Sequence, residues 1–470
     1  MTPATAHLAR PDFEEASEEA RLLALEARYC SHGDTVHYSA PKIFDRCEGS
    51  YLYDAEGLPY LDLQMWYSAV NFGYGNQRLN AALTRQLGRL PQVASQYLHA
   101  EKIELAALIA QRAEKTWGAA GRVHFNVGGS QAVEDALKLV RNAKRGKSTM
   151  FAFEGGYHGR TLGASAITSS YRYRRRYGHF DRALFVPFPY HFRGPKGMDK
   201  EEYGAHCVQQ FERLFESEYN GVWDPKAGEA ECAAFFVEAI QGTGGYVIPP
   251  KNFFIELKKV LDRYGILLVV DEIQMGVYRT GKLWSIEHFG VTPDVLVFGK
   301  AITNGLNPLS GIWAREELIN PTVFPPGSTH STFASNPLGT SVALETLRMV
   351  EEEDFGAQVA AKGAYFLAGL EELKRRHAVI GDVDGLGLAL RMEICEADGY
   401  TPNKALVDRM VEVALAGDLM VDGKRQGLVL DIGGYHKNVL TLAPSLLITP
   451  EEIDLALKLL DALLIRVTRG

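Results

Sequence analysis

The sequence predicts an α/β protein in which a large, mostly parallel sheet lies between layers of helices. Several short segments in the middle of the chain are continuously apolar instead of alternating, as strands are when a sheet is covered on both faces. Helical patterns separate these segments, as they do in successive strand–helix–strand units. At 470 residues the chain exceeds the usual size of one compact domain, so a second, smaller domain is expected.

The predicted strands of the large sheet are residues 123–125, 150–153, 234–237, 267–270 and 295–298. The stretch between the first two predicts a helix, because apolar side chains recur at helical spacing at Val133, Ala136, Leu137 and Val140. This apolar stripe is expected to face the sheet. Residues 190–230 are rich in glycine, proline and charge, so we expect an exposed excursion there.

Both ends of the chain are expected to build the smaller, α+β domain. Residues 11–100 begin with an acidic helical segment and pass through residues 51–57, which resemble a hairpin. Residues 345–470 mix helices with short strands, and Thr449, Pro450 and Glu452 together predict the capped start of the last helix. The expected division is a large domain of residues 75–345 and a small domain formed by residues 1–74 and 346–470.

Composition excludes some functional classes. Fifty basic against 58 acidic residues give a formal charge of -8, which argues against a nucleic-acid-binding protein. The basic and aromatic run at residues 171–177 fits a solvated loop or a subunit contact better. No apolar run approaches the roughly 20 residues that span a bilayer, so no membrane partner is expected. Five scattered cysteines without metal-ligand spacing, and a start without the apolar core of a signal peptide, favour a cytoplasmic protein.

A lysine and an acid follow two of the predicted strands. Asp271 closes the apolar run 266–270, and Lys300 follows the apolar run 295–298. An amine at a strand end can form an imine with an aldehyde, and a buried carboxylate can keep a ring nitrogen protonated. Taken alone, Lys300 is more often a solvated lysine and Asp271 a helix cap. Their joint position at the ligand-binding edge of an α/β sheet favours a functional site without metal ions.

Three further segments at strand ends carry candidate residues. Gly129 and Ser130 follow a strand and open a helix, where backbone amides can hold an anion; a plain turn with Ser130 as its cap is the alternative. Tyr157 can stack on a planar group and Arg160 can clamp a carboxylate; otherwise Tyr157 packs in the core and Arg160 bridges to a surface acid. Gln274, three residues after Asp271, can donate to a ring oxygen.

With these residues in order, the chain resembles a class III aminotransferase, a pyridoxal-phosphate-dependent family of fold type I. The resemblance covers roughly residues 40–465. The stretches that carry it are residues 128–138, 156–161, 238–245, 271–276, 279–281, 298–300 and 331–337. A fold type I protein has a large, mostly parallel sheet covered by helices and a smaller domain built from both chain ends, as the patterns above also predict.

The resemblance implies a cofactor, pyridoxal 5'-phosphate, and roles for particular residues. It implies that Lys300 carries the cofactor as a Schiff base and that Asp271 binds the ring nitrogen. The other residues that it assigns to the cofactor are Gly129 and Ser130 at the phosphate, Tyr157 on the ring, Gln274 at the ring oxygen, and Thr332 at the phosphate of the neighbouring subunit. A homodimer with shared sites, or a tetramer built from it, follows.

The resemblance implies less about the substrates than about the cofactor. Thr441 stands where ornithine and 4-aminobutyrate aminotransferases carry an arginine that pairs with the acid corresponding to Glu238. Trp66 is expected either in the substrate pocket or in the core, and Arg160 beside a substrate carboxylate. The expected reaction is transfer of an amino group from an amine or ω-amino acid to a 2-oxo acid, pyruvate or 2-oxoglutarate. Racemisation or epimerisation of an amino acid on the same scaffold is the alternative, and a non-catalytic binding protein is a more distant one.

Overall fold

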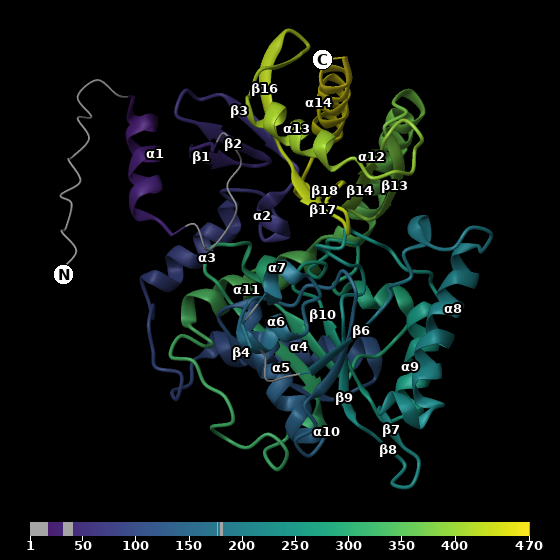
Figure 1. Ribbon diagram of the computed structural model, residues 1–470. Coiled ribbons are helices and arrows are strands. Elements are labelled where there is room, and N and C mark those ends of the chain that lie inside the picture. Colours follow the sequence, from purple (N-terminus) through teal and green to yellow (C-terminus); the bar gives the residue numbers. More distant parts are fainter. Residues whose placement is uncertain (1–16, 32–40, 176, 179–181, 470) are drawn as a thin grey trace, which may run out of the picture.

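The computed structural model describes residues 17–31, 41–175, 177–178 and 182–469, and its centre is a seven-stranded sheet (Figure 1). Neighbouring strands follow the order β4-β12-β11-β10-β9-β5-β6. Every pair is parallel except those made by β12, which runs antiparallel to both of its neighbours. The strands are β4 (Gly121–Asn126), β5 (Thr149–Phe153), β6 (Arg182–Val186), β9 (Cys232–Val237), β10 (Leu267–Asp271), β11 (Val295–Phe298) and β12 (Ser310–Arg315).

All the predicted strands belong to this sheet, and helices bury both of its faces. In β10, Leu268 and Val270 lie in one apolar cluster, whereas Leu267 and Val269 lie in another. Successive side chains of a strand point to opposite faces, so both faces are covered, which explains the continuous apolar runs in the sequence. The fold class predicted from the sequence is therefore confirmed. Strands β6 and β12 were not among the predicted strands.

The helices around the sheet include the one predicted from the stripe of Val133, Ala136, Leu137 and Val140, all of which are buried in α5. Helix α5 packs against β11 and β12, α4 against β4, and α9 against β10. The helices of this part of the chain are α3 (Gln77–Leu87), α4 (Ala100–Trp117), α5 (Gly129–Ala143), α6 (Leu162–Ala166), α7 (Tyr171–Arg174), α8 (Lys200–Glu212), α9 (Phe253–Arg263), α10 (Glu316–Ile319) and α11 (Pro337–Glu352).

The expectation of an exposed excursion at residues 190–230 is wrong for α8. Asp199 caps this helix with a capping box. Glu202 N donates to Asp199 Oδ1 at 2.8 Å, and Asp199 N donates to Glu202 Oε2 at 3.0 Å. Val208 and Phe211 are buried, and the Phe211 ring meets Phe151 edge-on at 4.9 Å between centroids. The cap and the spacing of these apolar side chains produce a packed helix. Strands β7 (Trp223–Asp224) and β8 (Glu229–Ala230) form a small ribbon after it.

Two smaller sheets form beside the large one, with the helices α12, α13 and α14 (Figure 1). The five-stranded sheet joins both chain ends, because β3 pairs in parallel with β16. Its strands are β1 (Phe44–Glu48), β2 (Tyr51–Asp54), β3 (Pro59–Asp62), β16 (Lys424–Val429) and β15 (Leu419–Val421). The four-stranded sheet contains β13 (Ile380–Leu386), β14 (Ala389–Ile394), β18 (Val439–Leu442) and β17 (Asp431–Gly433). The helices are α12 (Phe355–Arg376), α13 (Lys404–Leu415) and α14 (Pro450–Arg469).

Two local predictions for the chain ends are confirmed. Strands β2 and β3 form the expected antiparallel hairpin. The last helix begins with a capping box, in which Glu452 N donates to Thr449 Oγ1 at 3.2 Å and Thr449 N donates to Glu452 Oε2 at 2.9 Å. The acidic segment near the start of the chain forms α1 (Glu18–Tyr29), which has no buried residue. Across the described ranges, no helix is both long and apolar enough to cross a membrane.

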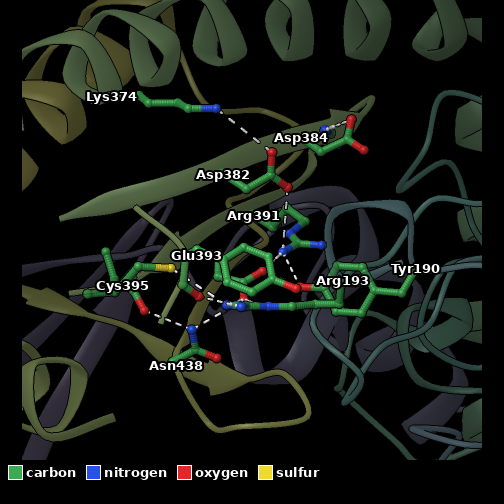
Figure 2. Close-up of polar contacts among 12 residues, drawn as sticks. Tyr190, Arg193, Lys374, Asp382, Asp384, Arg391, Glu393, Cys395 and Asn438 are labelled. Atoms are coloured by element: carbon green, nitrogen blue, oxygen red, sulfur yellow. Dashed lines mark hydrogen bonds and ion pairs between the residues drawn. The ribbon is translucent and has the colours of Figure 1, made fainter. Parts of the chain in front are cut away.

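Buried charged side chains join the C-terminal segment to the large sheet. Arg279 is fully buried and donates to the carbonyls of Leu388 and Pro444, at 3.1 and 2.6 Å, and to Asn71 Oδ1 at 2.6 Å. A second group of polar side chains connects β13, β14 and β18 with residues 190–193 (Figure 2). There, Glu393 accepts from Arg193 Nε at 2.8 Å. These contacts hold the four-stranded sheet against the large one.

Candidate active site

The candidate residues meet at the carboxyl ends of adjacent parallel strands. Asp271 ends β10, and Lys300 follows Gly299 at the end of β11, the strand paired with β10. Glu238 follows the end of β9, on the other side of β10. The loop after β5 carries Tyr157, and the turn after β4 leads into α5. In open α/β sheets this edge is where ligands bind.

Lys300 presents an amine that loses its proton easily. Burial lowers its pKa to about 8, although the nearby carboxylates of Asp271, Glu238 and Asp431 oppose this effect. The residue has a φ of 46°, in the left-handed region, which is uncommon for a side chain of this size. Backbone strain of this kind is typical of functional sites. A neutral amine is the form that attacks a carbonyl carbon.

Asp271 is buried and paired with a histidine. Its Oδ2 lies 2.9 Å from His158 Nδ1, and its Oδ1 accepts from Ile273 N at 3.1 Å. Burial disfavours the charged form of His158, but the hydrogen bond and charge of Asp271, together with Glu238, outweigh it and raise the pKa of His158. The pair therefore holds a carboxylate in a fixed orientation at the floor of the site.

Glu238 organises the backbone around this pair. Its two oxygens accept from Tyr157 N and Gly242 N, each at 2.9 Å. Burial raises the pKa of Glu238 to about 7, the charge of His158 opposes this, and that of Asp271 adds to it. The two hydrogen bonds of this carboxyl tie the loop after β5 to the loop after β9.

The start of α5 forms a cradle for an anion. The first amides of a helix have no acceptor within the helix, so those of Gly129 and Ser130 are available to a ligand. Arg160 N donates to Ser130 Oγ at 3.2 Å, which brings the loop after β5 against the helix start. Gly159 makes this approach possible, because its φ is +126° and a Cβ there would lie 2.3 Å from Ser130 Oγ.

Aromatic side chains line the loop beside the cradle. Tyr157 is half-buried, and its ring meets Tyr173 edge-on at 5.2 Å between centroids. The Arg160 guanidinium lies over the Tyr173 ring, 4.7 Å from its centroid. Tyr173 belongs to the basic and aromatic run expected to be a solvated loop or a subunit contact. The structure places part of that run, α7, beside Tyr157 and Arg160.

Gln274 and Trp66 are two further candidate residues, and each has a defined contact in the structure. Gln274 Nε2 donates to Tyr246 Oη at 3.2 Å. The Trp66 ring lies against Gly305, where a Cβ would be 3.1 Å from it, yet Trp66 is 55% exposed. The alternative of Trp66 as a core residue is therefore wrong.

Trp66 is presented by an unusual turn. Residues 65–68 all have positive φ, between 45° and 61°, so α2 (Met65–Ser68) is a left-handed turn. Such a conformation costs roughly 1–2 kcal/mol per residue for side chains larger than glycine. Asp62 Oδ1 holds its start by accepting from Gln64 N at 2.7 Å and Met65 N at 2.8 Å. The strain turns Trp66 and Tyr67 outward, leaving both of them exposed.

Thr332 is exposed in the turn that precedes α11, and its neighbour Phe333 is 70% exposed. The structure does not group Thr332 with the candidate residues at the strand ends. Three residues that it does group with them, His158, Tyr246 and Asp431, were not predicted as site residues. His158 lies inside the loop that the sequence singled out, but no spacing rule connects it with Asp271, 113 residues away. Tyr246 and Asp431 had no local signal.

Comparisons with known proteins agree with this geometry. The family model for class III aminotransferases matches residues 34–464. An alanine/serine racemase of Pyrococcus horikoshii is 32% identical over 90% of this chain and 85% of its own. A 5-aminovalerate aminotransferase of Pseudomonas aeruginosa is 31% identical over 89% of this chain and 92% of its own. An amine transaminase from an uncultivated Pseudomonas species, solved with pyridoxal phosphate bound, is 26% identical and has a TM-score of 0.81, with 99% of each chain covered.

A lysine of lowered pKa, a buried acid and a helix start at one sheet edge are the groups that a pyridoxal-phosphate enzyme of fold type I requires. The chain belongs to the class III aminotransferases. It is a pyridoxal-phosphate-dependent transferase that catalyses transamination. The described residues fit the cofactor, because they offer an amine for its aldehyde, a carboxylate for its ring nitrogen, and helix amides beside Ser130 for its phosphate.

Proposed function

We propose that Lys300 and Asp271 carry the chemistry of this transaminase, moving an amino group from an amine or ω-amino acid to a small 2-oxo acid. The observation that supports this best is their placement at the ends of two paired strands, with the pKa of Lys300 lowered to about 8 by burial. Bound pyridoxal phosphate supplies an aldehyde that takes up an amine and a ring that withdraws electrons from the substrate carbon.

In this proposal Lys300 acts twice through Nζ. The neutral amine would hold the bound cofactor, and once free the same amine would carry the proton that leaves the substrate carbon. A pKa near 8 suits both steps, because the group can accept and return a proton close to neutral pH. Asp271, oriented by His158, holds a proton on the ring nitrogen.

The remaining cofactor residues are proposed to position the ligand. The amides of Gly129 and Ser130, with the Ser130 hydroxyl, bind the phosphate; Tyr157 covers one face of the ring, and Gln274 donates to its oxygen. The hydrogen bond from Gln274 to Tyr246 supports this last role, since it already orients the amide.

We propose a homodimer in which Thr332 completes the phosphate site of the neighbouring subunit. The exposure of Thr332 and of Phe333 beside it supports this assignment, because a large exposed apolar side chain is suited to a subunit contact. Sedimentation of the holoenzyme measures the assembly. A Thr332→Ala variant that keeps native cofactor affinity as a dimer would contradict the shared site.

For substrates, Arg160 is proposed to bind a carboxylate, with Trp66 and Glu238 contributing to the substrate side of the site. Arg160 is exposed next to the cradle, and Trp66 is presented by its strained turn. The acceptor is a small 2-oxo acid, with pyruvate as the first to test and 2-oxoglutarate as the second. Thr441 supports that order, because it stands where ornithine and 4-aminobutyrate aminotransferases carry an arginine.

Racemisation is a second candidate, favoured by the similarity to an alanine/serine racemase and to a leucine/methionine racemase of Thermococcus litoralis, which is 30% identical over 92% of this chain. An assay of enantiopure amino acids without a 2-oxo acid separates the two reactions. Loss of optical purity without an acceptor supports racemisation, whereas product formation that requires an acceptor supports transamination.

The decisive test of the proposed chemistry is Lys300→Ala. This variant is expected to lose the visible absorption of the lysine-bound cofactor and to lose turnover together. Lys282→Ala is the matched control, because Lys282 is an exposed lysine outside the candidate site. Turnover by Lys300→Ala at a rate close to native would refute the assignment.

We also propose a large domain of residues 75–345 and a small domain of residues 1–74 and 346–470, located in the cytoplasm. The division is supported by the sheets, since the seven-stranded one is built within residues 121–315, and the five-stranded and four-stranded ones lie outside that range. The location is supported by free cysteines, of which Cys30 and Cys47 are exposed. Limited proteolysis tests the division, and fractionation of cells tests the location.

A further inference from the structure

A cavity of about 500 Å³ lies between residues 190–200 and the four-stranded sheet. Its walls come from segments that are far apart in the sequence, and they include Phe192, Asp382, Arg391 and Tyr400. None of the candidate residues at the strand ends is among the described residues that line it. A volume of this size is typical of sites for small ligands, so the cavity has room for a ligand of its own.

The register of β13 and β14 places four charged side chains on one face of this hairpin. Asp382 lies opposite Glu393, and Asp384 lies opposite Arg391, in the two antiparallel strands. Residues two apart in a strand, and residues opposite one another, point to the same face of a sheet. That face is turned toward residues 190–200, because two side chains of that segment donate to Glu393.

Arg391 lines the cavity although only 2% of it is exposed. All of its polar contacts use one nitrogen: Nη2 donates to Tyr190 and Glu393 and lies 3.7 Å from Asp382 Oδ2 (Figure 2). Within the described ranges, neither Nε nor Nη1 has an acceptor, and of the two only Nε is fully enclosed. A guanidinium has five N–H donors, and leaving buried ones unpaired costs free energy. Nη1 is therefore available to a ligand carboxylate.

Asp382 is the complementary group, a carboxylate with cations near it but without a hydrogen bond from the described residues. Arg391 Nη2 and Lys374 Nζ lie 3.7 and 3.9 Å from its oxygens. Burial raises the pKa of Asp382, and the charges of Arg391 and Lys374 oppose this effect. An ammonium group in the cavity would oppose it in the same way and would supply the missing donors. Asp384, two residues further on, has only a 3.5 Å contact with Lys200 Nζ.

The rest of the wall is apolar. The centroids of the Phe192 and Tyr400 rings are 5.7 Å apart, and Tyr400 is 44% exposed. Met198, Val247 and Ile248 add further apolar side chains. A ligand with a hydrocarbon part would cover this surface and remove it from water, which is favourable.

We propose that this cavity binds an apolar α-amino acid at a site separate from Lys300. The carboxylate of the ligand accepts from Arg391 Nη1, its ammonium group pairs with Asp382, and its side chain lies against Phe192 and Tyr400. A ligand with a single charge would leave one of the two buried groups without a partner, whereas an α-amino acid carries both charges on one carbon. The site does not depend on the proposed reaction.

Calorimetric titration of the holoenzyme tests this site after borohydride reduction, which blocks the reaction at Lys300. The probes are L-leucine, 4-methylpentanoate, which is leucine without its amine, and 3-methylbutylamine, which is leucine without its carboxylate. Leucine is expected to bind at least roughly tenfold more tightly than either analogue, the effect of one charge-assisted hydrogen bond.

Three variants assign the binding to the cavity. Asp382→Asn should weaken leucine binding roughly tenfold without weakening that of 4-methylpentanoate, because only the ammonium group loses its partner. Arg391→Lys, checked for native thermal unfolding, should weaken leucine and 4-methylpentanoate but not 3-methylbutylamine. Asp422→Asn is the control; it removes an exposed acid that pairs with Lys458 at 2.7 Å and should leave leucine binding unchanged.

Three results would overturn this proposal. The first is a native protein that shows no saturable binding of leucine. The second is equal affinity of the native protein for leucine and for an analogue with one charge. The third is native leucine affinity in Asp382→Asn, which needs no disruption of the buried Arg391. The transamination assays described above are independent of all three.

Discussion

Replacing His158 tests how much the orientation of Asp271 contributes to catalysis. We choose His158→Phe because the site accommodates an aromatic ring: His158 is 2% exposed and its ring centroid lies 6.1 Å from that of Phe236. The substitution removes the bond between Nδ1 and Asp271 Oδ2, at 2.9 Å, and preserves most of the packing. Asp271 then keeps the single bond from Ile273 N.

The magnitude follows from the bond that is lost. A hydrogen bond to a charged group contributes about 1.5–3 kcal/mol. At about 1.4 kcal/mol per factor of ten, the donor half-reaction should slow by roughly ten- to a hundredfold. Asp271 also loses one of the two hydrogen bonds that orient its carboxylate, so its contact with the ring nitrogen should weaken. The variant should therefore bind the cofactor more weakly as well.

Single-turnover kinetics of the donor half-reaction and cofactor retention during dialysis measure the two effects. His377→Phe is the matched control, because it breaks another histidine–aspartate pair, 2.6 Å from His377 Nε2 to Asp461 Oδ1, on the far α12–α14 surface. The control should keep native kinetics. A native half-reaction rate together with native cofactor retention in His158→Phe would refute the positioning role of His158.

Three other predictions concern the amine, the substrate anchor and the fold. The rate at which pyridoxal phosphate attaches to the apoenzyme should increase with pH and become constant above about pH 8, because only the neutral amine of Lys300 attacks the aldehyde. A rate that does not depend on pH, measured by stopped-flow absorbance, would contradict this prediction. Arg160→Ala should raise KM roughly tenfold for carboxylate substrates and leave KM for simple amines unchanged; equal KM values for both classes would exclude a carboxylate role. Arg279→Met should leave the three acceptors of the guanidinium without this donor and lower the free energy of unfolding in urea by about 3 kcal/mol. The control, Arg122→Met, removes an exposed ion pair and should lower it by less than about 1 kcal/mol. Equal losses of stability in the two variants would contradict the role given to Arg279.

Much of the fold was predictable because a strand that is buried on both faces of its sheet has apolar residues at every position, which can be recognised in the local sequence. The runs at 267–270 and 295–298 are apolar at every position, and the structure places them in β10 and β11. The stripe on α5 and the capping box before α14 are local patterns too. Strand β12 was missed because its role depends on pairing: Gly311 lies so close to His124 O that a Cβ would be 2.4 Å away, a constraint that arises only when β4 is beside it.

By itself, the sequence predicted five of the seven strands of the large sheet and the order of the candidate residues, Lys300 and Asp271 among them, along the edge where the strands end. These follow from periodicity and from the ends of strands, which neighbouring residues set. Only the tertiary structure decided that His158 meets Asp271 and that the charge of Asp431 reaches Lys300. Such contacts join segments more than 100 residues apart, and their energies depend on desolvation and distance, which exist only after the chain has packed.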